Sequence, residues 1–169
     1  MMHIKAIEII ARSLRDSVKG DPVGRAQMAL CQYIAGMGFS NVGLGIVHSM
    51  AHPLSAVYDI PHGVACAILL TPVLKFNAPS TANKYRDIAV AMGVKNTEDM
   101  SIEQARQACI EAVEKLSVDV GIPQKLTQLG VKEEDLQYLS ESAFVDACTP
   151  GNPRNVSLEA IKEINKSIM

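Results

Sequence analysis

Three histidines within fifteen residues are the clearest candidates for chemistry in this chain. His48 and His52 are four residues apart, so both imidazoles project from one face of a helix about one turn apart. His62 follows ten residues later, after the short connection 58–60. A helix, this connection and a returning helix can bring His62 beside His48, which gives two neutral nitrogen ligands on facing helices. We therefore predict a divalent-metal site at these histidines.

A simpler explanation must be weighed against the metal site. An isolated histidine on an apolar helix is usually a hydrogen-bonded core residue. Here three imidazoles lie among Val, Leu, Ile, Met and Ala, and the segment offers few polar partners beyond Ser49, Ser55, Tyr58 and Asp59. The cluster therefore favours a metal, although imidazole suits iron, zinc, copper and nickel and does not choose among them.

The elements that position the histidines are predicted to be helices throughout. Helical periodicity and stop signals place them at about residues 4–18, 24–35, 42–56, 61–74, 81–93, 102–120, 133–147 and 157–169. Pro61 suits the first turn of a helix, and the run Ser101 to Gln104 has the form of a capping box. No strand alternation persists, so the expected fold class is all-α, a helical bundle-like domain, with residues 1–169 forming a single domain.

A glycine-rich run, Gly36–Asn41, is expected to end the second helix as a loop. Its glycines superficially match a phosphate-binding loop, but such a loop follows a strand, and here a helix comes first. We interpret the run as a place of close backbone packing or substrate approach. No strand–glycine-loop–helix unit occurs in the sequence, so a dinucleotide-binding domain would have to lie outside it.

Composition excludes several classes of partner. The 16 basic and 18 acidic residues are interspersed and give a net charge of -2, which argues against nucleic acid. The longest apolar stretch, Val64–Val73, is about half of the roughly 20 residues needed to span a bilayer, so a buried helix is expected and no membrane partner. The cysteines show no C-x-x-C spacing and are expected to be reduced thiols in a cytoplasmic protein; they are Cys31, Cys66, Cys109 and Cys148.

Four stretches resemble the iron-dependent (group III) alcohol dehydrogenase family, most closely its branch acting on lactaldehyde and 1,2-propanediol. They are Gly36–Leu54, Pro61–Ala65, Lys84–Ala89 and Gly151–Arg154. The resemblance covers nearly the whole chain and implies the C-terminal metal-binding domain of a nicotinamide-dependent oxidoreductase that interconverts small aldehydes and alcohols or diols. It also implies that the N-terminal nucleotide-binding half, which holds NAD(H), and two further metal ligands precede residue 1. The chain alone is then expected to have little or no activity.

The same resemblance implies roles for individual residues. His48 and His62 would be metal ligands, with Fe²⁺ expected and Zn²⁺ as the alternative, and His52 would relay the proton of the alcohol. Phe39 would line the substrate pocket and Cys148 would lie at its edge, although ordinary packing explains both residues equally well. In such a site the cation acts as a Lewis acid on the alcohol or aldehyde oxygen, and hydride transfer belongs to the nicotinamide.

The chain departs from the family pattern at two serines, and two other functions are alternatives. Ser49 and Ser55 stand where the family pattern has glycine, so the identity of the substrate is left open. His3 is expected to be an exposed terminal histidine rather than a metal ligand. The main alternative is a non-catalytic helical module that binds metal weakly or not at all and whose exposed apolar surface allows a homo-oligomer. A further alternative is a zinc-dependent activity like that of dehydroquinate synthase or glycerol dehydrogenase.

Overall fold

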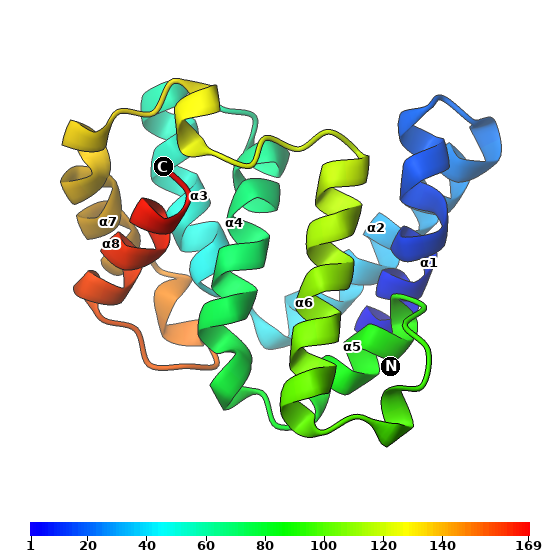
Figure 1. The fold of residues 1–169 in the computed structure, drawn as a ribbon. Coiled ribbons are helices and arrows are strands. Elements are labelled where there is room, and N and C mark those ends of the chain that lie inside the picture. Colours follow the sequence, from blue (N-terminus) through cyan, green and yellow to red (C-terminus); the bar gives the residue numbers. More distant parts are fainter. The chain divides into compact units, whose positions relative to one another are not determined.

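The computed structural model describes all of residues 1–169 and contains helices but no strand, which confirms the all-α prediction. The chain divides into two compact units (Figure 1). Unit 1 comprises Met1–Val42 and Thr81–Val120, and unit 2 comprises Gly43–Ser80 and Gly121–Met169. The expectation of one domain across residues 1–169 stays a prediction, and each unit is described by itself.

Unit 1 contains four α-helices and one 3₁₀ turn. They are α1 (Met2–Val18), α2 (Pro22–Val42), α5 (Lys84–Ala91), η2 (Thr97–Asp99) and α6 (Ile102–Asp119). α1 packs along α2 around buried Ala6, Ile9 and Cys31. The predicted capping box starts α6, since the Ser101 hydroxyl accepts the N–H of Gln104 and the Gln104 side chain accepts the N–H of Ser101.

The glycine-rich run that starts at Gly36 is helical, so the predicted loop is wrong. α2 continues without interruption to Val42. Gly38 is buried against the ring of His3 on α1, and a Cβ added at Gly38 would lie 2.5 Å from His3 Nε2. Close packing of the two helices at this glycine outweighs its weak helix propensity of about 1 kcal/mol. The interpretation as a place of close packing is thus confirmed at Gly38, and His3 is exposed as expected.

Unit 2 is built from four α-helices joined by short 3₁₀ turns. They are α3 (Ile46–Tyr58), α4 (His62–Asn77), η1 (Ala78–Ser80), η3 (Leu126–Leu129), η4 (Glu133–Asp135), α7 (Leu136–Phe144), η5 (Thr149–Gly151) and α8 (Leu158–Ser167). α3 packs against α4 and α7, and α8 packs against α7 and α4. Ile46, Met50 and Leu54 recur every fourth residue on α3 and are fully buried, so one face of this helix lies in the core.

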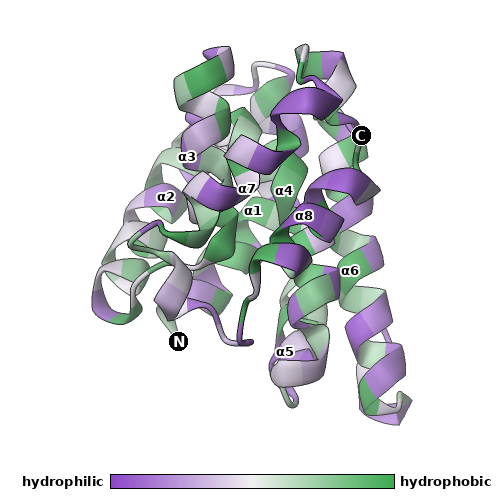
Figure 2. Cartoon of the chain, turned by 90° about the vertical axis from the view of Figure 1, so that its left-hand side faces the viewer, coloured by the Kyte–Doolittle hydropathy of each residue, from purple (hydrophilic) through white to green (hydrophobic).

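The apolar helix α4 is a core element of unit 2. By length and composition alone, the segment His62–Ser80 could cross a membrane. Core helices of globular proteins meet the same criterion, and Leu69 and Val73 of α4 are buried in the main hydrophobic cluster. Figure 2 shows α4 as largely hydrophobic, as its place in this core requires.

A tight reversal joins α3 to α4. Asp59 adopts a left-handed conformation with φ 55° and ends α3, and Pro61 directly precedes the first residue of α4. The two helices predicted around the histidines are confirmed, although α3 begins only at Ile46, after Gly43 with a φ of 79° and the extended N-cap residue Gly45. This reversal returns the first turn of α4 to the side of α3.

Candidate metal centre

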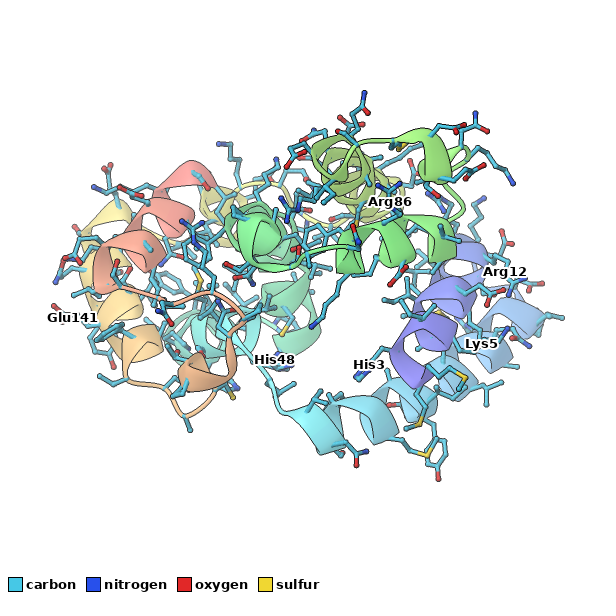
Figure 3. The ribbon with its side chains drawn as sticks, turned by 90° about the horizontal axis from the view of Figure 1, so that it is seen from below. His3, Lys5, Arg12, His48, Arg86 and Glu141 are labelled. Carbon is cyan, nitrogen blue, oxygen red and sulfur yellow. The ribbon has the colours of Figure 1, made fainter.

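The three histidine rings lie together in unit 2, as the sequence predicts. His48 projects from α3 (Figure 3), and His62 is the first residue of α4. Their ring centroids are 5.5 Å apart, and the His52 ring is stacked on that of His62, also at 5.5 Å. The spacing along α3 and the reversal into α4 therefore bring all three imidazoles to one place.

Cys66 completes a group of possible metal ligands that the sequence analysis missed. His48, His62 and Cys66 each offer one ligand atom, and these atoms all lie within 4.8 Å of one another. Cys66 Sγ is 3.5 Å from His62 Nε2, because the two residues are one turn apart on α4. The sequence did contain a signal for Cys66, because Cys66 lies four residues after His62, the same spacing that relates His48 to His52.

The donor atoms fit a divalent cation. Metal–nitrogen distances of about 2.0–2.1 Å and a metal–sulfur distance of about 2.3 Å place neighbouring tetrahedral ligands roughly 3.3–3.6 Å apart. The observed separation of 3.5 Å between Cys66 Sγ and His62 Nε2 falls in this range. Burial, and then the nearby His62 and His52, hold the pKa of His48 below its usual value, so this ring is neutral at neutral pH. A lone pair is thus available for a metal.

His52 is oriented by a carboxylate from outside the histidine segment. Its Nδ1 lies 2.8 Å from Oδ2 of Asp146. A carboxylate can only accept, so Nδ1 carries the hydrogen and Nε2 keeps its lone pair. Burial acts to raise the pKa of Asp146, but the N–H of Cys148 and the His52 ring outweigh it and leave the pKa below its usual value. The carboxylate is therefore ionised at neutral pH.

Cys148 lies beside this pair. One ligand atom each of His52, Asp146 and Cys148 lies within 4.8 Å of the other two. Burial, and then Asp146, raise the pKa of the Cys148 thiol, so it is protonated at neutral pH. No local pattern pointed to Asp146, because it contacts a residue 94 positions away. Phe39 is an exposed residue of α2 in unit 1, and its role in the substrate pocket stays a prediction.

Partly buried hydrogen bonds hold the loop that carries Cys148. Ser49 on α3 is fully buried, and its hydroxyl oxygen lies 2.8 Å from Oγ1 of Thr149. The side-chain amides of Asn77 and Asn152 donate to each other at 3.0 and 2.8 Å. Two side-chain contacts therefore tie this loop to α3 and to the last residue of α4.

Proteins with similar sequences are alcohol dehydrogenases and aldehyde reductases. Lactaldehyde reductase of Escherichia coli (strain K12) is 60% identical over 163 residues, which cover 96% of this chain and 42% of that protein. NAD-dependent methanol dehydrogenase of Bacillus methanolicus is 35% identical over 168 residues, which cover 98% and 44%. The chain thus spans less than half the length of these relatives.

Solved structures and a family model agree with these relatives. The crystal structure of a 1,3-propanediol oxidoreductase matches with a TM-score of 0.95 at 42% identity and covers 98% of this chain and 44% of that one. The model of the Fe-containing alcohol dehydrogenase family, C-terminal, matches residues 1–169. The chain therefore belongs to the Fe-containing alcohol dehydrogenase family and represents its C-terminal domain.

Proposed function

We propose that this chain is the metal-binding part of a nicotinamide-dependent alcohol dehydrogenase that interconverts small aldehydes and alcohols or diols. The observation that carries the proposal is the meeting of His48 and His62 from two helices, with ring centroids 5.5 Å apart and the His52 ring beside them. The names of the relatives mention lactaldehyde, methanol and 1,3-propanediol, which supports a small substrate. The 60% identity favours an activity like that of lactaldehyde reductase.

His48 and His62 would hold the metal, with Fe²⁺ expected for this family and Zn²⁺ as the alternative. A divalent cation bound there would supply Lewis acidity, which stabilises an alkoxide or polarises an aldehyde carbonyl. The protein contributes a neutral His48 ring with one free lone pair, since burial lowers the pKa of His48. It also contributes a fixed separation, because α3 and α4 are packed against each other by buried residues.

His52 would carry the proton of the alcohol. Asp146 accepts the hydrogen on Nδ1, so Nε2 is the atom that can take up a proton. The ionised Asp146 then stabilises the imidazolium, and it keeps the ring in one orientation before and after the transfer. Because the His52 side chain is 43% exposed, the proton can pass on to solvent.

The nicotinamide cofactor is expected to bind mainly outside residues 1–169. This all-helical chain offers no strand–glycine-loop–helix unit, so NAD(H) would be held by a separate nucleotide-binding region. Residues 1–169 alone should therefore show little or no turnover. All four cysteines are free thiols, which is consistent with the predicted cytoplasmic location.

Anaerobic calorimetric titration with Fe²⁺ and with Zn²⁺ tests the metal site. We expect one-to-one binding by the wild type and loss of binding in His48→Ala and His62→Ala. His3→Ala is the matched control, because it removes a histidine of unit 1 and should leave binding unchanged. Circular dichroism of each variant reports whether the helices remain folded.

The second candidate is the non-catalytic helical module. It is favoured by an apolar cavity of about 820 Å³ in unit 1, lined mainly by Met1, Met2, Ile4, Met37 and Val90, which offers surface for a partner. The dehydrogenase proposal would be rejected if the wild type bound no metal, or if His48→Ala and His62→Ala bound metal as strongly as the wild type. The module would then be the better description.

A further inference from the structure

The chain passes between its two units at three places, and a residue with a positive φ lies at or beside each of them. The crossings fall after residues 42, 80 and 120. Gly43 has a φ of 79°, Ala82 a φ of 46° and Gly121 a φ of 80°. We propose that these three crossings form a hinge about which unit 2 moves as a body relative to unit 1.

The two glycines of the hinge are required by backbone conformation and not by lack of space. A Cβ added at Gly43 or at Gly121 would meet nothing within 4 Å. Both glycines are exposed, and so is Ala82. Glycine adopts positive and negative φ about equally readily, so these two positions can absorb a change of backbone direction without disturbing any neighbouring side chain.

Ala82 is the strained member of the hinge. A residue with a Cβ rarely adopts a positive φ, because the Cβ then crowds the following carbonyl oxygen. Ala82 nevertheless does so in the short connection between the end of η1 at Ser80 and the start of α5 at Lys84. Movement away from the observed conformation therefore relieves strain at this crossing, whereas it costs little at the two glycines.

Helix termination explains part of this pattern but not all of it. Gly43 follows α2 and Gly121 follows α6, and a glycine at a helix end commonly has a positive φ. Gly20 ends α1 in the same way, but α1 and α2 then pack along each other in one unit. The three crossings instead join helices of different units, and α1, α2, α5 and α6 pack mainly on one another, as α3, α4, α7 and α8 also do. A few loop residues that absorb a change of φ between separately packed bodies are what a hinge requires.

The hinge affects the proposed function through Phe39, and this consequence rests on that function. Phe39 lies in unit 1 close to the first crossing, whereas His48, His52 and His62 all lie in unit 2. Motion of unit 2 carries the three rings together and leaves their spacing unchanged, but it changes their distance from Phe39. The hinge would therefore regulate whether Phe39 reaches a substrate bound at the histidines.

Residual dipolar couplings of the wild type in a weakly aligning medium test the hinge without any substitution. The couplings of each unit are fitted with an alignment tensor of its own, which reports the average orientation of that unit and the extent of its motion. We expect tensors of different magnitude for the two units, because a mobile connection averages their couplings unequally. A single tensor that fits both units would overturn the inference. The measurement needs no metal, so its failure is distinguishable from failure of the proposed function in the calorimetric titration.

Substitutions at the crossings locate the motion. Gly43→Ala and Gly121→Ala should bring the two tensor magnitudes closer together, because alanine tolerates a narrower range of φ than glycine, and Ala82→Gly should move them further apart. Gly130→Ala is the matched control, since Gly130 also has a positive φ, 81°, and empty space at its Cβ but lies within unit 2. It should leave the ratio of the two magnitudes unchanged, and circular dichroism reports whether each variant is folded. Crossing variants that change this ratio no more than Gly130→Ala does would show that the crossings are not the hinge.

Discussion

Replacing Thr149 by valine would remove two hydrogen bonds that hold the loop beside the histidines. Thr149 Oγ1 lies 2.8 Å from the hydroxyl of Ser49 and 2.7 Å from the carbonyl oxygen of Ala143. Valine keeps the shape of threonine, so little packing is lost. Each hydrogen bond contributes about 1 kcal/mol, and the Ser49 hydroxyl, which is fully buried, would lose this partner. We therefore expect Thr149→Val to lower the free energy of unfolding by about 2 kcal/mol.

A double-mutant cycle isolates the contact between the two hydroxyls. Urea unfolding followed by circular dichroism would compare the wild type, Thr149→Val, Ser49→Ala and the double variant. Because Ser49→Ala removes a bond that Thr149→Val also removes, we expect a coupling energy of about 1 kcal/mol. Ser55→Ala is the control on the same helix, since the buried Ser55 hydroxyl has no hydrogen-bond partner and its removal should not destabilise the protein. Effects that add within about 0.5 kcal/mol would refute the hydrogen bond between Ser49 and Thr149.

Three further predictions concern the core, the thiols and the end of α4. Leu69 is fully buried, so Leu69→Ala should destabilise the protein by about 2–5 kcal/mol in urea unfolding. Burial raises the pKa of Cys109 to about 11, so only about one thousandth of the Cys109 thiol is ionised at pH 8. Because Cys109 is also fully buried, iodoacetamide labelling followed by mass spectrometry should modify Cys148 well before Cys109. Arg154 Nη1 donates to the carbonyl oxygen of Phe76 at 2.6 Å, and the guanidinium carbon of Arg154 lies 4.3 Å from the centroid of the Phe76 ring. Arg154→Lys should therefore lower the free energy of unfolding by about 0.5–1 kcal/mol, seen as a lower melting temperature.

Each of these expectations has a clear contrary result. A loss below about 1 kcal/mol in Leu69→Ala would mean that α4 does not form the core described here. Rapid labelling of Cys109 in the folded protein would show that its site opens to solvent. An unchanged melting temperature in Arg154→Lys would show that the stacked guanidinium contributes nothing to stability.

Local sequence patterns were sufficient for most of the helices and for the histidine cluster. The capping box at Ser101 and the proline at position 61 mark helix starts that the structure confirms. His48 and His52 are one turn apart on α3, and a short reversal at Asp59 accounts for the return of His62. Such features depend on residues within a few positions of each other, so the sequence carries their full signal.

Local patterns failed where close packing overrides propensity. The run from Gly36 contains helix-weakening glycines, yet it is helical because Gly38 allows α2 to pack against His3 of α1. The glycine that favours a loop in isolation is the residue that this contact requires. The sequence shows Gly38, but only the tertiary structure shows that His3 packs against it.

By itself, the sequence determined the helical class of this protein and the convergence of its three histidines, because both follow from periodicity and a short turn. Only the tertiary structure decided what surrounds them. The carboxylate of Asp146 on His52 and the hydroxyl of Thr149 on Ser49 join residues 94 and 100 positions apart. No local period encodes these contacts, because they arise only when packing of the core brings distant segments together.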